Sequence, residues 1–247
     1  MTIGITGQNG FLGLNLKNYI KENIAEIEII NFDNNYFLDK LKLDEWVSKC
    51  EVIVHFAALS RHSDSSVVYI NNIGLVTKLL DSINRTNSAP HLIFSSSKQE
   101  IFETGYGKSK REGRELLKMY SIEHEMIFTG LIIPNVFGPF AKPKYASVVA
   151  TFCYQLINDE TPVILNDLEM ELIYVEQLAI EIIYCIENKI NNPEYIIPFR
   201  YKIKVSKILE TLMYFKEVYL INNRIPDFKN DFEKKLFATF KSYINYK

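Results

Sequence analysis

The stretch Thr6-Gly7-Gln8-Asn9-Gly10-Phe11-Leu12-Gly13 decides the fold. It follows the apolar residues 1–6, which are typical of a buried strand, and it precedes residues with the apolar spacing of a helix. Gly7 permits a tight turn, Gly10 lets a pyrophosphate approach the backbone, and Gly13 lets the helix pack closely on the sheet. With the free amides of the helix start, this pattern predicts dinucleotide binding. A glycine-rich turn that serves packing alone is the alternative. The expected cofactor contacts along the turn are Gly7, Gln8, Asn9, Gly10, Phe11, Leu12 and Gly13.

Short apolar stretches alternate with helical ones through the first 134 residues. Strands that are almost entirely apolar and are separated by helices indicate a parallel sheet covered on both faces. We therefore predict an α/β fold with a Rossmann-type sheet. The expected strands are residues 1–6, 27–32, 51–56, 91–94 and 126–133, and the helices between them are residues 11–22, 43–49, 67–84 and 107–120.

The regular alternation of short apolar stretches with helical ones ends after Pro134. We predict a Rossmann core from residues 1–134 and 163–189 that binds NAD(P), and a small substrate-binding lobe from residues 135–162 and 190–247. The expected elements of this part are helices 147–158, 176–187, 205–218 and 231–244, and strands 161–165, 172–175 and 194–199.

Composition excludes several classes of protein. The 247 residues are 47% apolar and carry a formal charge of −2, so no basic excess points to nucleic acid. No apolar stretch has the roughly 18–20 residues of a membrane helix, and no charged leader precedes an apolar run. The cysteines at 50, 153 and 185 lack metal-ligand spacing and a disulfide pattern. We expect buried thiols in the reducing cytoplasm, no metal site, and neither nucleic acid nor a membrane as a partner.

An acidic residue, Asp33, ends the second expected strand. A carboxylate here accepts hydrogen bonds from the adenosine ribose hydroxyls and repels a 2′-phosphate, which favours NADH over NADPH. The alternative is a carboxylate that opens a local turn with Asn34 and Asn35.

The residues from Tyr106 to Lys110 have the pattern Y-x-x-x-K. Four residues make about one helical turn, so the phenol and the ammonium group share a helix face. Upstream, the hydroxyls of Ser95, Ser96 and Ser97 end a strand, and open parallel sheets bind ligands at that edge. An exposed tyrosine and a solvated lysine are the alternative.

These motifs resemble the extended short-chain dehydrogenase/reductase family. The likeness also includes an H-x-A-A strand end at His55, residues 135–139, similar to the family's N-V-Y-G-P, and residues 174–176, similar to its Y-V-D. By this resemblance, Tyr106 exchanges a proton with a substrate carbonyl or hydroxyl, and Ser97 hydrogen-bonds the same oxygen. Lys110 holds the nicotinamide ribose and lowers the pKa of the tyrosine. The remaining implied cofactor contacts are Ala57 and Ala58, against which the cofactor lies, and Asn72, which supports the lysine through water.

Residues 142–154 and 232–240 further resemble the reductase domain of the CapF family of bacterial capsule enzymes. This resemblance implies NADPH-dependent reduction of a UDP-linked 4-keto-2-acetamido-2,6-dideoxyhexose. Those enzymes also carry a C-terminal cupin domain, whereas this chain ends at Lys247, so a shorter natural relative and a fragment are both open. The cofactor is also open, because the resemblance implies NADPH and Asp33 favours NADH.

Candidate substrate contacts follow the expected strand 126–133. They are Asn135, Lys142, Lys144 and Tyr145, which we expect to bind the diphosphate and the sugar. A solvated loop is the alternative for the two lysines.

Three further functions compete with reduction. Dehydratases of the family place an Asp-Glu pair beside the catalytic hydroxyl, but Lys98, Gln99 and Glu100 follow Ser97 here, which disfavours dehydration. A nucleotide-sugar 4-epimerase uses the same three residues, and a non-catalytic dinucleotide sensor would keep the fold alone. We favour the reductase, and we expect a homodimer formed through residues 67–84 and 107–120.

Overall fold

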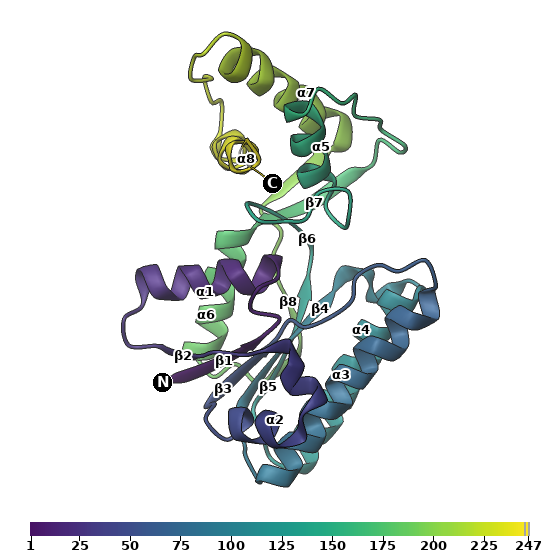
Figure 1. The fold of residues 1–247 in the computed structure, drawn as a ribbon, viewed down its shortest axis with the longest axis vertical. Coiled ribbons are helices and arrows are strands. Elements are labelled where there is room, and N and C mark those ends of the chain that lie inside the picture. Colours follow the sequence, from purple (N-terminus) through teal and green to yellow (C-terminus); the bar gives the residue numbers. More distant parts are fainter. Residues whose placement is uncertain (245, 247) are drawn as a thin grey trace. The chain divides into compact units, whose positions relative to one another are not determined.

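The computed structural model describes residues 1–244 and 246. They form two compact units (Figure 1). The first contains Met1–Ile133 and Ala179–Ile197, and the second contains Pro134–Leu178 and Pro198–Lys247. Among the described residues, no helix is both long and apolar enough to cross a membrane.

The first unit is built on a six-stranded parallel sheet. Its strands β1, β3 and β4 are almost entirely buried, as expected for a sheet covered on both faces. The predicted α/β Rossmann-type fold is thereby confirmed. In sheet order the strands are β2 (Glu28–Ile30), β1 (Thr2–Thr6), β3 (Val52–His55), β4 (His91–Ser97), β5 (Phe128–Ile133) and β8 (Asn192–Ile196).

Helices cover both faces of this sheet (Figure 1). On one face lie α1 (Phe11–Asn23) and the part of α6 (Val175–Glu187) that belongs to this unit. On the other lie α2 (Lys40–Val47), α3 (Ser65–Thr86) and α4 (Gly105–Glu123). Two short 3₁₀ helices, η1 (Asn34–Leu38) and η2 (Lys98–Ile101), follow β2 and β4.

The register of the parallel strands places the candidate catalytic segments at one edge. Thr6 of β1 pairs with His55 of β3, and His55 is opposite Phe94 of β4. The carboxyl ends of β1, β3 and β4 therefore lie together, with the glycine turn directly after β1 and the serine run at the end of β4.

The second unit contains a three-stranded sheet in the order β6 (Asn135–Phe137), β7 (Glu169–Tyr174), β9 (Tyr201–Lys204). Its helices are α5 (Val148–Ile157), α7 (Val205–Phe215), which continues as the π-helix η3 (Lys216–Ile221), and α8 (Asp231–Ser242). Aromatic rings form much of its interior. Phe137 packs on Tyr174, Tyr201 and Phe232, and Phe215 packs on Phe237 and Phe240.

The division of the chain differs from the predicted one at two segments. Residues 163–178 were expected in the core, but β7 pairs with β6 and β9, so they belong to the second unit. Residues 190–197 were expected in the lobe, but β8 pairs in parallel with β5 and completes the six-stranded sheet. The residues of a single strand carry no signal for which neighbour it will pair with.

The expected strand at 161–165 is wrong, because these residues have no regular structure. Their apolar side chains face solvent instead of a core, with Val163 68% and Leu165 89% exposed. The strand β9 was not expected. Its alternating half-buried and exposed residues span only four positions, which is a weak signal so close to the start of α7.

Candidate active site

The glycine turn has the geometry that the sequence predicts. Gly7 has a φ of +69°, and a Cβ atom on it would lie 2.9 Å from the backbone nitrogen of Ala57. A Cβ on Gly13 would overlap the carbonyl oxygen of Gly7 and lie 2.7 Å from Cα of Gln8. Packing of the turn against β3 and α1 therefore accounts for these two glycines.

Gly10 has a different reason to be glycine. It is the N-cap of α1, and no side chain caps this helix, whereas side chains cap α2, α3, α4, α5 and α8. A Cβ on Gly10 would meet only the Gly7 oxygen, at 3.2 Å, so the exposed side of the turn is bare backbone. Uncapped amides at a helix start, next to bare backbone, fit the pyrophosphate of a dinucleotide.

Gln8 connects this turn to the second strand. Its buried side chain donates a hydrogen bond from Nε2 to the carbonyl oxygen of Phe32 at 2.6 Å, while Oε1 is buried without a partner. Asp33, the next residue, is exposed and accepts a hydrogen bond from the amide of Asn35 at 2.9 Å, which caps η1. The structure thus contains the local turn, and the contact of Asp33 with a ribose stays a prediction.

A buried histidine joins the strand ends beside the turn. His55 Nδ1 lies 2.9 Å from Thr6 Oγ1, which also accepts a hydrogen bond from the amide of Ala57 at 3.2 Å. Burial, together with the charge of Lys110, lowers the pKa of His55 to about 3, so the imidazole is neutral near pH 7. Ala57 and Ala58, which follow it, are partly exposed at this edge.

Lys110 is the most constrained of the predicted catalytic residues. Its ammonium group donates to Ser95 Oγ at 3.3 Å, and that hydroxyl donates to the carbonyl oxygen of His55 at 3.1 Å. Lys110 Nζ also lies 5.0 Å from the ring centroid of Phe94 and 5.6 Å from that of Tyr106. Because the side chain is buried, desolvation lowers the pKa of Lys110 to about 7.

Ser97 ends β4 at the same edge. It is half-buried, and its Oγ accepts a hydrogen bond from the amide of Gln99 at 3.1 Å, which starts η2. Alternate residues of a strand face the same side, so Ser97 shares its face with Ser95, the partner of Lys110. The structure therefore brings Lys110 together with Tyr106 and Ser95, and Ser97 extends the same strand face.

Asn72 supports α4 by direct contacts. Its buried Nδ2 donates to the carbonyl oxygen of Leu59 and to Ser109 Oγ, both at 3.0 Å, and its Oδ1 accepts from the amide of Leu59 at 2.7 Å. Ser109 directly precedes Lys110. Asn72 thus holds the loop after β3 against the helix that carries Tyr106 and Lys110.

The candidate substrate residues in the second unit are more exposed. Asn135 Nδ2 donates to the carbonyl oxygen of Glu171 at 3.4 Å. Lys142 Nζ lies 5.5 Å from the ring centroid of Tyr145. Lys144 Nζ is 2.7 Å from a carboxylate oxygen of Glu160, so this ammonium group already has an anionic partner. The structure does not bring the two lysines to a common partner.

Residues 3–197 match the model of the NAD dependent epimerase/dehydratase family. The chain belongs to this family. The predicted membership is confirmed, and the features of residues 6–13 fit the nicotinamide dinucleotide that the family name implies.

The family includes relatives with named activities. A UDP-2-acetamido-2,6-beta-L-arabino-hexul-4-ose reductase from Pseudomonas aeruginosa is 29% identical over 219 residues, which are 87% of this chain and 58% of the relative. The putative UDP-glucose 4-epimerase of Methanocaldococcus jannaschii is 26% identical over 71% of this chain and 70% of its own.

Among solved structures, the capsular polysaccharide assembling protein CapF from Staphylococcus aureus is 31% identical, with a TM-score of 0.83. The likeness covers 99% of this chain and 65% of CapF. The predicted resemblance to the CapF reductase domain is confirmed. The chain spans less than two thirds of the length of CapF and of the Pseudomonas reductase.

From the sequence we did not select one residue that the structure places beside the predicted catalytic lysine. Ser95 contacts Lys110, although we selected only the third serine of the run. The period of two along a strand was the available signal, because it places residues 95 and 97 on one face and residue 96 on the other.

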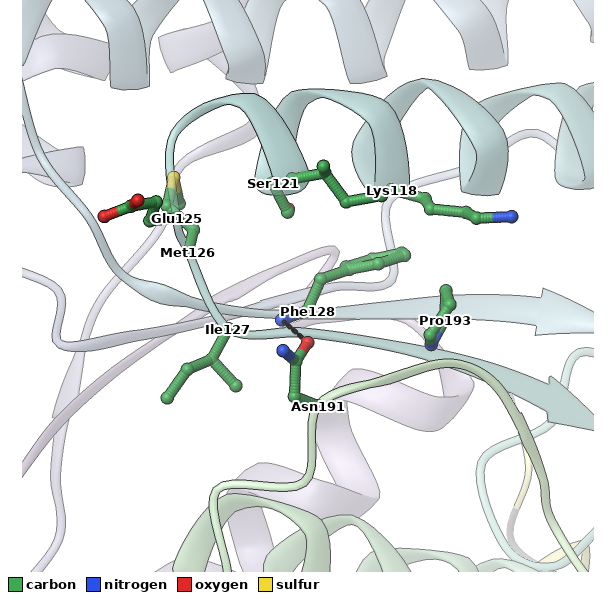
Figure 2. Close-up of a pocket in the computed structure, with 9 residues that line it drawn as sticks. Lys118, Ser121, Glu125, Met126, Ile127, Phe128, Asn191 and Pro193 are labelled. Atoms are coloured by element: carbon green, nitrogen blue, oxygen red, sulfur yellow. Dashed lines mark hydrogen bonds between the residues drawn. The ribbon is translucent and has the colours of Figure 1, made fainter.

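A pocket of about 370 Å³ lies at the opposite edge of the sheet (Figure 2). Figure 2 shows it where α4 ends and β5 starts, with Asn191 Oδ1 accepting a hydrogen bond from the amide of Phe128. Phe128 pairs with Leu92 near the start of β4, whereas Ser97 pairs with Ile133 at the far end. This pocket is therefore separate from the edge of the sheet that carries the predicted catalytic residues.

Proposed function

We propose that this protein reduces the C4 ketone of a UDP-linked 2-acetamido-2,6-dideoxyhexose with NAD(P)H, in the synthesis of a capsule or other surface polysaccharide. The observation that carries the proposal is the buried Lys110 ammonium group beside Tyr106 and the serine run at the carboxyl edge of the sheet. The reductase from Pseudomonas aeruginosa and CapF support the choice of sugar and reaction.

In this reaction, bound NAD(P)H supplies the hydride. Tyr106 donates its phenolic proton to the ketone oxygen, which becomes the hydroxyl of the product, and solvent returns a proton to the phenolate. Ser97 donates a hydrogen bond to the same oxygen. A positive charge on Lys110 at roughly 4–6 Å stabilises the phenolate by about 3–4 kcal/mol at an effective dielectric near 20. That matches the roughly 4 kcal/mol needed to bring a phenol from about 10 to about 7.

The surroundings of Glu100 argue against dehydration. Glu100 is the one carboxylate that follows Ser97 within η2, and both of its oxygens accept hydrogen bonds from Arg114. A carboxylate held in a buried ion pair is a poor candidate for an acid that expels a sugar hydroxyl.

A 4-epimerase is the second candidate, favoured by the relative from Methanocaldococcus jannaschii. Both reactions use the same phenol, ammonium and hydroxyl, and they differ in whether the hydride returns to the same sugar. A non-catalytic dinucleotide sensor is the third candidate, and the proximity of Tyr106 and Lys110 counts against it.

The absorbance of reduced nicotinamide separates the three candidates. The wild type and Tyr106→Phe are mixed with NADH or NADPH and a UDP-4-keto-6-deoxy sugar. Stoichiometric oxidation by the wild type alone supports the reductase. Conversion of a UDP-sugar to its 4-epimer without net oxidation supports the epimerase, and cofactor binding without turnover supports the sensor.

The proposal extends to the cofactor, the oligomer and the compartment. The likeness to CapF favours NADPH and Asp33 favours NADH, and the same assay ranks them.

A homodimer through α3 and α4 is supported by the exposed apolar side chains Ile70, Met119 and Ile122. Light scattering that gave the mass of a single 28.8 kDa chain would exclude the dimer. The unpaired cysteines support the cytoplasm.

A further inference from the structure

A buried ion pair lies directly behind the catalytic edge. Arg114 donates to both carboxylate oxygens of Glu100, from Nε at 3.1 Å and from Nη2 at 3.0 Å. The hydroxyl of Ser96 donates to the same carboxylate. All three residues are at most 8% exposed, so the Glu100 carboxylate is satisfied by protein donors. The remaining nitrogen of Arg114, Nη1, donates to the more exposed carboxylates of Glu115 and Glu194.

The pair connects the two segments that hold the predicted catalytic groups. Ser96 and Glu100 flank Ser97 in β4 and η2, whereas Arg114 lies in α4, one helical turn beyond Lys110. Arg111 of the same helix adds a hydrogen bond from Nη1 to the carbonyl oxygen of Glu100 at 2.9 Å.

The same two segments touch through their backbones at Gly107. A Cβ atom there would overlap the carbonyl oxygen of Phe102 and lie 2.5 Å from that of Gln99. The residues that join η2 to α4 contribute little packing, because Ile101 is 74% and Phe102 54% exposed. The ion pair, the hydrogen bond from Arg111 and the contact at Gly107 therefore hold η2 against α4.

We propose that Glu100 and Arg114 are positioning residues that fix the hydroxyl of Ser97 relative to Tyr106 and Lys110. The catalytic part of this inference rests on the proposed function. A buried ion pair adds little net stability, because desolvation offsets its Coulomb attraction. Its main effect here is geometric, and displacement of reacting groups by about 1 Å costs roughly 100-fold in rate.

The chain contains a control cluster of the same composition, which is more exposed, with the side chains of Asp44 and Arg85 21% and 36% exposed. Asp44 accepts two hydrogen bonds from Arg85, at 2.9 and 2.7 Å, and one from Ser82 Oγ at 2.6 Å. This second carboxylate–arginine–serine cluster joins α2 to α3. Ser82 lies about 15 Å along α3 from Asn72, so the control cluster is remote from the catalytic edge.

The first test compares turnover in paired variants: Ser96→Ala with Ser82→Ala, and Glu100→Gln with Asp44→Asn. We expect the variants at 96 and 100 to lose about 10- to 100-fold in kcat, with the KM for the keto sugar and the Kd for the cofactor within about 3-fold of wild type. The control variants are expected to keep kcat within about 2-fold. Equal losses of kcat in both clusters, at matched losses of thermal stability, would overturn the proposal.

The second test is hydrogen–deuterium exchange, which needs no substrate. We expect residues 97–110 to exchange faster in Ser96→Ala and Glu100→Gln than in wild type, and to be unchanged in the two controls. If Glu100→Gln does not fold, Ser96→Ala decides the result. Unchanged exchange over residues 97–110 would refute the positioning role. Failure of the wild type to turn over any keto sugar would refute the proposed function. In that case hydrogen–deuterium exchange would still test whether the ion pair holds residues 97–110 in place.

Discussion

The predicted catalytic residues and the predicted substrate residues differ in how the protein holds them. At the carboxyl edge of the first unit's sheet, Lys110 is buried and hydrogen-bonded to Ser95. In the second unit, Lys142 and Lys144 are exposed, and Lys144 forms a surface ion pair with Glu160. The protein thus imposes the chemistry of the first set, whereas a ligand can compete for the charges of the second.

The difference in burial also bears on the electrostatics of the two sets. Burial beside Phe94 lowers the pKa of Lys110 to about 7, so its charge depends on what lies next to it. An exposed ion pair such as Lys144 with Glu160 contributes roughly 0–1 kcal/mol, since water and salt screen it. Variants of the first set should therefore have larger effects.

The largest effect is expected for Tyr106→Phe. This change removes the proton donor and keeps the ring near Lys110, so we expect kcat to fall by at least about 1,000-fold while the cofactor Kd stays within about 3-fold. Steady-state kinetics and cofactor fluorescence measure the two quantities. Tyr120→Phe, in the same helix, is the control and should keep full activity. A Tyr106→Phe protein with more than a tenth of wild-type turnover would exclude this donor.

A smaller effect is expected for Lys110→Met on stability. The folded pKa of about 7 lies below the unfolded value of about 10.4, so between these pH values the unfolded chain binds a proton that the native lysine does not. The contribution of Lys110 to stability therefore falls as the pH drops from about 10 to about 7 and is constant below that.

Lys110→Met should remove this dependence and raise the free energy of unfolding by about 4 kcal/mol at pH 7, with little gain near pH 10. Urea unfolding at the two pH values measures it, and Lys118→Met in the same helix, at a half-buried position with an ion-pair partner, is the control. An equal change in the free energy of unfolding at both pH values would contradict the lowered pKa of Lys110.

The double variant Lys142→Ala, Lys144→Ala tests the second set. Loss of two exposed charges should raise the KM for the UDP-sugar about 10-fold and leave kcat within about 2-fold, because these side chains bind without taking part in proton transfer. Lys202→Ala, which breaks a comparable surface pair with Glu169, is the control. An unchanged KM would remove both lysines from the substrate site.

The smallest effect is expected for Asp33→Ala. Without the carboxylate, the ratio of kcat/KM for NADPH to that for NADH should rise about 3- to 5-fold, since repulsion of a 2′-phosphate is lost at an exposed position. Asp39→Ala removes a similar N-cap from α2 and is the control. If the ratio of kcat/KM values is the same in wild type and Asp33→Ala, Asp33 does not influence cofactor choice and serves only to cap η1.

Local patterns in the sequence determined the order of strands and helices through residue 133, the glycine turn and the pairing of Tyr106 with Lys110. Each of these depends on residues within a few positions of one another, so the periods of strand and helix are enough to predict them. The sequence alone also placed the chain in the correct family, because the motifs occur in order along residues 1–190.

The tertiary structure alone decided which strands pair and which polar side chains meet. The pairing of β8 with β5, the contact of Asn72 with Ser109 and the ion pair of Glu100 with Arg114 join residues 14 or more positions apart. Burial of Lys110 likewise depends on how α4 packs against β4. Hydrophobic periodicity marks which residues are buried but not which neighbours they meet, and hydrogen bonds and desolvation depend on those neighbours.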